Sequence, residues 1–285
     1  KVKRMKKIFE LPDWNSLAPM SDATLPLLET ALLIARDEYP DLEAENYIAL
    51  VDDYALQLQR SLPTQNDITS KLIAINQFLY REIGFSGNSD QYDDPRNSYL
   101  NQVFDRKLGI PISLAVVQIA VMQRLGLPLE GVSFPGHYLV RLPVEDGIIV
   151  LDPFNQGRPV SFEELRERII PHMEGQSPTD QQLFQVLEPA TSRMTLMRMI
   201  RNLQAIYQQQ GDYARVARSA DRLLKLSPNL ADALRDRGIA YAQIGYSQGA
   251  QEDLTRYLQL QPEAPDIDLV RNHLIDHSSQ KNSLN

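Results

Sequence analysis

The stretch GIPISLAVVQIAVMQRLGLP, residues 109–128, determines the fold of the first half of this 285-residue chain. Its apolar residues do not follow a single helical face but occupy nearly every position from Ile112 to Met122. A helix that is apolar all round is buried on all sides. Pro111 suits the first turn of such a helix, where no backbone N–H is needed. We therefore expect a core helix over 111–125.

Three short β-like segments follow the core helix, at 130–134, 137–142 and 147–151. The last two are joined by a turn at 143–147, which predicts a hairpin. His137 opens the second segment and Asp152 follows the third, so their side chains can face each other across the hairpin. The pattern predicts a small antiparallel sheet packed on the core helix, with His137 in contact with Asp152.

The rest of the first half has a helical pattern. Apolar residues recur at spacings of three and four from about residue 23 to Gly84, which stands where a helix terminator belongs. The segment SGNSDQYDDPRNS, 86–98, is dense in turn formers and predicts a loop. Helix returns after Ser161, which forms a capping-box pattern with Glu164. The expected fold is α+β and mostly helical, with one small antiparallel sheet.

The last third of the chain repeats itself. Five matched pairs lie 34 residues apart: Tyr207 and Tyr241, Gly211 and Gly245, Leu224 and Leu258, Leu226 and Leu260, Pro228 and Pro262. This period and these blocks resemble the tetratricopeptide repeat, in which each unit is a helix hairpin stacked on its neighbours. We predict a first domain at 8–189 and, at 190–285, two all-α repeats with flanking helices. Such repeats bind proteins, so a protein partner is expected there.

The order of the motifs resembles the core of papain-like and transglutaminase-like enzymes. In that core a glycine-led turn delivers a cysteine to the start of a buried helix, and His and Asp follow on adjacent strands. Here QRLGLP, 123–128, ends the helix, PGHYLVRL, 135–142, contains His137, and VLDPFN, 150–155, contains Asp152.

A closer resemblance extends over nearly the whole chain. The segment NSYLNQVFDRKLGIPISL, 97–114, together with the His and Asp motifs, resembles the SirB-type transglutaminase-like family. That resemblance implies a transglutaminase-like domain joined to C-terminal tetratricopeptide repeats. Members of that family are bacterial proteins, mostly of undetermined activity.

The chain contains no cysteine, so the nucleophile of that core is absent. Counting back from the Leu-Gly-Leu-Pro motif puts Pro111 or Ile112 at its position. The nearest hydroxyl, Ser113, is rotated from the expected direction by about 100° to 200° around the helix.

Two interpretations of Ser113 are open. In the first, a shifted helix start brings Ser113 to His137 and Asp152, as the Ser-His-Asp arrangement of a hydrolase or acyl transferase. In the second, Ser113 bonds a backbone N–H in the first helical turn. The domain is then a non-catalytic or weakly catalytic pseudoenzyme, and the chain acts as a protein-interaction or regulatory module. The second interpretation is favoured.

Further residues are candidates for the cleft beside His137. Gly136 suggests a close backbone approach, Asn155 follows the Asp motif as a polar pocket residue, and Asn97 matches the family pattern. His273 and His277 are four residues apart but have no further ligand in the sequence pattern. We expect no metal and no cofactor.

The net charge of −8 is unevenly distributed. Residues 8–189 contain 12 basic and 27 acidic side chains, a balance that would repel a phosphate backbone, so nucleic acid is not an expected partner. Residues 190–285 contain 12 basic and 10 acidic side chains, with arginines concentrated in the first repeat. These arginines either form a solvated or docked face or bind an acidic partner. No apolar run approaches the roughly 18 residues of a membrane span, and the start lacks a signal-peptide pattern, so we expect a cytoplasmic protein without membrane contact.

Overall fold

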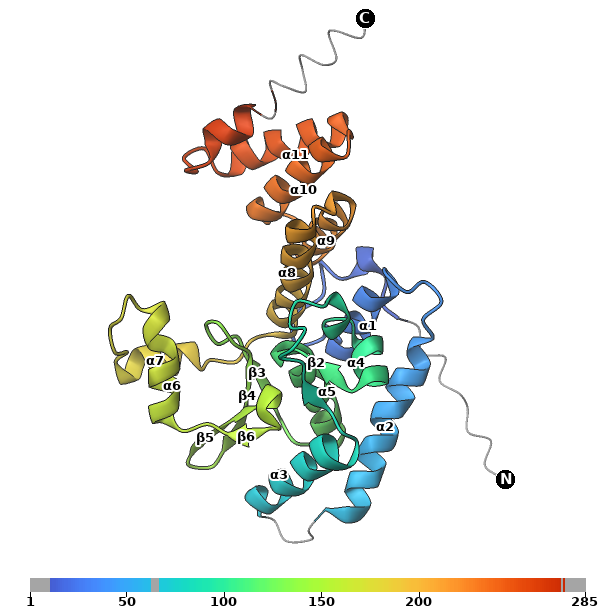
Figure 1. The fold of residues 1–285 in the computed structure, drawn as a ribbon, viewed down its shortest axis with the longest axis vertical. Coiled ribbons are helices and arrows are strands. Elements are labelled where there is room, and N and C mark those ends of the chain that lie inside the picture. Colours follow the sequence, from blue (N-terminus) through green and yellow to red (C-terminus); the bar gives the residue numbers. More distant parts are fainter. Residues whose placement is uncertain (1–10, 63–66, 273, 275–285) are drawn as a thin grey trace, which may run out of the picture. The chain divides into compact units, whose positions relative to one another are not determined.

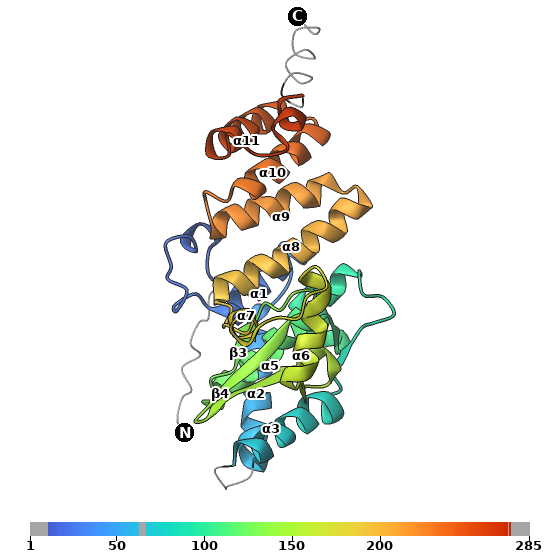
Figure 2. The same cartoon turned by 90° about the vertical axis from the view of Figure 1, so that its left-hand side faces the viewer.

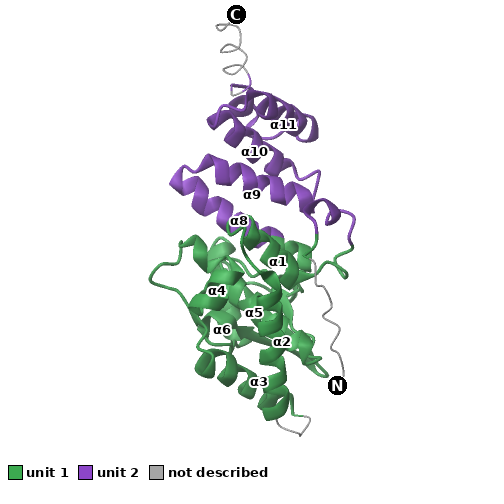
Figure 3. Cartoon of the chain, turned by 90° about the vertical axis from the view of Figure 1, so that its right-hand side faces the viewer, with its two compact units in different colours: residues 1–12, 21–196 green, residues 13–20, 197–285 purple. Residues whose placement is uncertain are grey.

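The computed structural model of the chain describes residues 11–62, 67–272 and 274. Its contacts define two compact units (Figure 3). The first consists mainly of residues 21–196, and the second of residues 13–20 and 197 onward. The units divide after Leu196, and the domain boundary predicted after residue 189 remains a prediction.

The first unit is mostly helical, as the sequence pattern predicts (Figures 1 and 2). Its α-helices are α1 (Leu27–Arg36), α2 (Ala44–Ser61), α3 (Ile68–Asn76), α4 (Leu100–Arg106), α5 (Pro111–Arg124), α6 (Phe162–Ile169) and α7 (Asp180–Val186). The carboxylate of Asp67 accepts hydrogen bonds from the first free N–H groups of α3, and Ser161 caps α6 in the same way. A π-helical turn, η2 (Gln77–Glu82), continues α3, and Gly84 then adopts a φ of +88°. Gly84 therefore ends this helical segment, as predicted.

Helix α5 is the core of the first unit. Every residue from Pro111 to Met122 is buried. The helix contacts α1, α2 and α4 as well as the sheet strands β3 and β4, so it lies between helices and sheet (Figure 1). The helix that is apolar all round is thus covered all round, and the prediction for 111–125 is confirmed.

The main sheet has four antiparallel strands in the order β3-β4-β5-β6. They are β3 (Glu130–Val132), β4 (Leu139–Val144), β5 (Gly147–Asp152) and β6 (Arg158–Pro159). The predicted hairpin is β4–β5, with Val140 opposite Leu151 and a turn at 145–146. The second strand begins at Leu139, so His137 lies in the turn that precedes it. Pro143 is tolerated in β4 because β3 pairs only with residues 139–141 and does not reach it.

Two strand pairings lie outside the predicted set. The two-residue strand β6 closes the sheet, and β1 (Ser86–Gly87) pairs in parallel with β2 (Leu108–Gly109). Both are too short to show a period-2 pattern. The pairing of β1 with β2 fixes one end of the predicted loop 86–98 beside the start of α5.

The repeat segment is helical throughout, as predicted. Its helices are α8 (Ser192–Gln210), α9 (Tyr213–Leu226), α10 (Ala231–Gln243) and α11 (Ser247–Leu260). The matched glycines Gly211 and Gly245 adopt φ values of +70° and +79° in the two equivalent helix connections. Only glycine enters this region without strain, which explains their repetition at the period of 34. The flanking helix expected after the second repeat lies partly outside the described residues.

Within the described ranges, no helix has both the length and the apolar composition needed to cross a bilayer.

Candidate functional site

His137 and Asp152 form a hydrogen-bonded pair at one end of the hairpin β4–β5. The pairing of Val140 with Leu151 brings the turn before β4 beside the last residue of β5. His137 Nε2 lies 2.9 Å from Oδ1 of Asp152, and the Asp152 side chain is fully buried whereas 20% of the His137 side chain is exposed. The contact predicted from the spacing of 15 residues is present.

Asp152 receives hydrogen bonds from two further residues. Asn155 donates its side-chain Nδ2 to Oδ2 at 2.7 Å and its backbone N–H to Oδ1 at 3.3 Å. Arg168 on α6 donates Nη1 to Oδ2 at 3.0 Å. Burial by itself raises the pKa of Asp152, but the hydrogen bonds from His137, Asn155 and Arg168 outweigh it and lower the pKa below its ordinary value. Asp152 is therefore an ionised carboxylate that only accepts, and His137 Nε2 donates to it.

Ser113 has a different set of partners. Its Oγ donates to the backbone carbonyl of Asn97 at 2.6 Å and accepts the backbone N–H of Ile110 at 3.0 Å. Ile110 is the N-cap of α5 and Ser113 is its third helical residue, so the hydroxyl satisfies an N–H group that has no partner within the helix. The Ser113 side chain is fully buried. Both of these bonds direct Oγ to the backbone beneath the start of α5.

Gly109 explains why the Ser113 hydroxyl takes this direction. A Cβ at position 109 would lie 2.7 Å from Ser113 Oγ, closer than side chains approach. The glycine that precedes the helix therefore makes room for the hydroxyl. The turn before α5 therefore encloses Ser113. In the papain-like and transglutaminase-like core that the sequence resembles, the same turn would present the nucleophile.

Asn97 is also a buried structural residue. Its Nδ2 donates to the carbonyls of Gln91 and Tyr92, and its Oδ1 accepts from Nδ2 of Asn88 at 3.1 Å. These bonds hold the loop 86–98 in shape, and the Asn97 backbone carbonyl receives Ser113. Of the three predicted pocket residues, Asn155 contacts the His-Asp pair through Asp152 and Gly136 immediately precedes His137. The side chain of Asn97 is bonded to its own loop and to Arg106 on α4.

Gly136 and Phe154 shape the surroundings of His137. Gly136 has a φ of +67°, and a Cβ there would lie 2.7 Å from Nε2 of His172. A second imidazole is thus packed against the turn that contains His137. Phe154 packs edge-on against the His137 ring, with ring centroids 6.1 Å apart, and a Cβ at Gly87 would lie 2.6 Å from the Phe154 ring. The close approach predicted at Gly136 is present.

Sequence reasoning missed two residues beside the pair, Arg168 and His172. Arg168 lies four residues after Glu164 on α6 and bonds both Glu164 and Asp152. The helical spacing of Glu164 and Arg168 is visible in the sequence, but the direction of α6 toward Asp152 is not. His172 follows in the short 3₁₀ segment η5 (Ile170–His172), without a spacing that relates it to His137.

The arrangement provides an imidazole oriented by a buried carboxylate, which is the proton-handling half of a catalytic triad. The hydroxyl nearest to the position of the missing nucleophile, that of Ser113, is bonded to the backbone of Asn97 and Ile110 instead. Among the described residues, no group of three or more His, Asp or Glu side chains is placed to hold a metal ion.

Comparison with known proteins gives the class of the chain. A family model of the transglutaminase-like superfamily matches residues 45–201, and a tetratricopeptide-repeat model matches residues 203–274. The first match includes α5, the hairpin and the His137–Asp152 pair. The fold and these matches define a transglutaminase-like protein in which tetratricopeptide repeats follow the transglutaminase-like region.

The chain belongs to the transglutaminase-like superfamily and, within it, to the UPF0162 proteins. A UPF0162 protein of Xylella fastidiosa (strain 9a5c) is 57% identical over 271 residues, which cover 95% of this chain and 96% of that protein. UPF0162 protein YchA of Escherichia coli (strain K12) is 28% identical over 267 residues, covering 90% and 94%. F-box only protein 21 of Mus musculus is 29% identical over 200 residues, 66% of this chain but 30% of that longer protein. No solved structure matches.

Proposed function

We propose that this protein is a protein-interaction or regulatory module in which the transglutaminase-like region has no catalytic activity, or only a weak one, and the repeats bind a protein partner. One observation carries the first half of the proposal: the Ser113 hydroxyl is fully buried and bonded to Asn97 and Ile110. A nucleophile must be within hydrogen-bond reach of its base and open to substrate. A SirB-type membership and a cytoplasmic location are part of the same proposal.

The second half rests on the repeats. Tetratricopeptide repeats expose helix faces that generally bind proteins. A hollow of about 760 Å³ lies along α11 and is lined by six polar side chains and Leu260. Arg256 lines this hollow and also a second one of about 320 Å³ formed with α9 and α10. We assign the partner-binding surface to these two hollows.

The alternative function is a hydrolase or acyl transferase that uses Ser113, His137 and Asp152. The His137–Asp152 pair favours it, because an imidazole held by a buried carboxylate is the base that such an enzyme needs. It requires a movement at the start of α5 that frees Ser113 from the Asn97 carbonyl and turns its hydroxyl toward His137.

Labelling with a fluorophosphonate probe tests the catalytic half. The unchanged protein is expected to give no more label than a Ser113→Ala variant. Labelling that disappears in Ser113→Ala and in His137→Ala, while both variants remain folded by circular dichroism, would instead support the serine enzyme.

The interaction half is tested with the full chain. An immobilised wild-type protein is expected to retain a saturable partner from a lysate of cells in which the protein occurs. An Arg256→Glu variant should lose that partner, whereas Arg60→Glu, the same charge change at an exposed position of α2, should retain it. Equal retention by all three proteins, or none by the wild type, counts against the proposed surface.

A further inference from the structure

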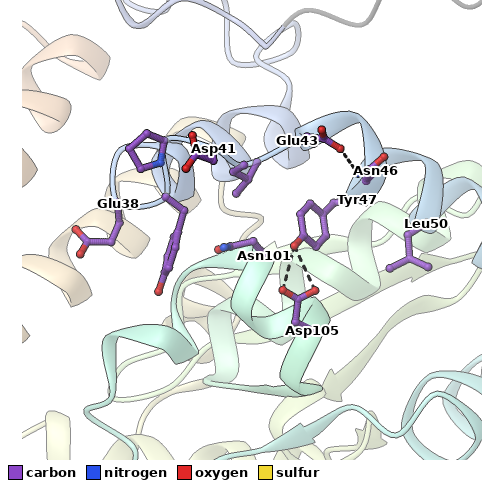
Figure 4. Close-up of a pocket in the computed structure, with 11 residues that line it drawn as sticks. Glu38, Asp41, Glu43, Asn46, Tyr47, Leu50, Asn101 and Asp105 are labelled. Carbon is purple, nitrogen blue, oxygen red and sulfur yellow. Dashed lines mark hydrogen bonds between the residues drawn. The ribbon is translucent and has the colours of Figure 1, made fainter.

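A hollow of about 670 Å³ lies on the first unit, between the connection of α1 to α2, helix α2 itself and α4 (Figure 4). This volume is typical of ligand pockets. Four carboxylate side chains line it, from Glu38, Asp41, Glu43 and Asp105, and none of the described residues that line it is Lys, Arg or His. The described wall of the hollow is therefore acidic, above all at Asp41, Glu43 and Asp105.

Asn101 gives independent support for a ligand. Its side chain lines the hollow, and only 5% of the residue is exposed. Its Oδ1 is buried and receives no hydrogen bond from any residue that the structure describes. Figure 4 shows Asn101 on α4 between Tyr47 and Glu38, with its amide end pointing to the Glu38 side of the hollow. Buried acceptors are nearly always bonded, so this oxygen lacks a donor that a ligand can supply.

Tyr47 and Asp105 fix one wall of the hollow. The Tyr47 hydroxyl donates to both carboxylate oxygens of Asp105, at 3.2 Å and 3.0 Å. Burial, and then the bond to Asp105, raise the pKa of Tyr47 to about 12, so the phenol stays protonated. The Tyr47 ring rests on Phe104, with centroids 5.8 Å apart. An aromatic ring held beside a carboxylate is a combination that attracts organic cations.

The arrangement of the carboxylates distinguishes an organic cation from a metal ion. Among the described residues there is no group of three or more acidic or His side chains that could hold a metal. The four carboxylates are thus spread around the rim and do not converge on one point. Such a rim suits a cation with several N–H donors and an apolar stem, for which Leu42 and Leu50 provide contact.

We propose that this hollow binds a guanidinium or primary ammonium group on an unbranched carbon stem, the chemistry of an arginine or lysine side chain. The cationic head lies among the carboxylates and donates to Asn101 Oδ1, after a small rotation of the amide, and the stem lies against Tyr47 and the leucines. A free diamine or guanidine and a side chain on a polypeptide share this chemistry. The hollow is formed by residues of the first unit alone.

Calorimetric titration of the full chain tests the proposal with three probes. These are agmatine, the peptide acetyl-Gly-Arg-Gly-amide, and the same peptide with citrulline, which keeps the shape but not the charge. We expect saturable binding of at least one cationic probe at low salt, weaker binding at high salt, and none of the citrulline peptide. Binding of agmatine alone identifies a free small molecule, and binding of the peptide identifies a side chain. No binding of either, or equal binding of the citrulline peptide, overturns the proposal.

Matched variants locate the binding. Asp105→Asn and Glu43→Gln should each raise the Kd by about three- to tenfold, because each removes one charge from the rim. Glu45→Gln removes the same charge from the exposed side of α2, outside the lining, and should change the Kd by less than about twofold. Asn101→Ala should weaken binding without lowering the Tm. If Asp105→Asn fails to fold, the Glu43→Gln variant, at an exposed position, still tests the proposal. Equal Kd values in all folded variants overturn it.

Discussion

Oδ1 of Asp152 lies 2.9 Å from Nε2 of His137, and the same carboxylate also accepts hydrogen bonds from Arg168 and Asn155. One buried anion thus holds together a turn, a strand end and a helix. The pair has the geometry of a catalytic base and its orienting carboxylate. The hydrogen bonds from three elements also give the carboxylate a structural role.

Replacing Asp152 by Asn should destabilise the protein by about 3 kcal/mol, because it leaves four N–H donors from three residues facing a neutral amide that is itself partly a donor. Urea unfolding measures this loss. Asp146→Asn in the exposed turn of the hairpin is the control, and its free energy of unfolding should be close to that of the wild type. Equal values for the two variants would contradict a role for Asp152 in holding the unit together.

Stability should fall as the pH drops below about 4.5. The hydrogen bond from Arg158 lowers the pKa of Glu164 from 4.5 to about 2, and Asp152 also has a lowered pKa. A lowered pKa in the folded state adds stability above the unfolded-state value, and this is lost as the pH falls through the folded-state value. The urea midpoint measured from pH 7 to pH 2.5 should therefore decrease, and less steeply in Asp152→Asn. A parallel decrease in both proteins would refute the contribution of Asp152.

Ser113→Ala should reduce the free energy of unfolding by about 1–3 kcal/mol, since it leaves the Ile110 N–H and the Asn97 carbonyl without their partner. The absence of cysteine from the chain gives a second measurement. A thiol introduced as Ser113→Cys should react with maleimide only in urea, whereas Glu145→Cys in the exposed hairpin turn should react in the native protein. Rapid native labelling at position 113 would show that the site opens.

Gly136→Ala should be more destabilising than Gly126→Ala by about 1 kcal/mol. Both glycines have a similar positive φ, +67° and +73°, but a Cβ at position 126 has open space whereas one at 136 meets His172. Thermal unfolding of both variants measures the difference. Combining Gly136→Ala with His172→Ala should remove most of it, and an unchanged difference would mean that His172 is not the obstacle.

Gly238→Ala tests the packing of the repeats. A Cβ at this position on α10 would lie 2.7 Å from the side chain of Leu254 on α11. The two helices must then separate, which should lower stability by about 1–3 kcal/mol although alanine is the better helix former. Gly249→Ala is not a suitable control because a Cβ there meets Tyr246. Gly245→Ala is not a suitable control either, because its φ of +79° strains alanine whereas Gly238 lies within the helix. Thermal unfolding measures the loss, and combining Gly238→Ala with Leu254→Ala should remove the steric part of it; an unchanged effect would mean that Leu254 is not the obstacle.

The sequence by itself determined the elements whose signals are local. The apolar residues on all sides of 111–122 predict the buried helix that the structure contains. The spacing of His137 and Asp152 across one hairpin predicts their contact, which is also present. The period of 34 fixed the repeat helices and their two glycine turns. Each of these follows from residues close in the chain, where helix and strand geometry alone place the side chains.

Only the tertiary structure decided where single polar side chains point. Ser113 bonds a carbonyl 16 residues earlier, Arg168 reaches Asp152 from another element, and Tyr47 meets Asp105 across 58 residues. These pairs have no periodicity, because they depend on which loops the packing around α5 brings together. The sequence pattern around a serine at the start of a helix is the same whether its hydroxyl faces a cleft or bonds the backbone beneath it. The carbonyl of Asn97, positioned by its own loop, supplies the bond that directs Ser113 inward.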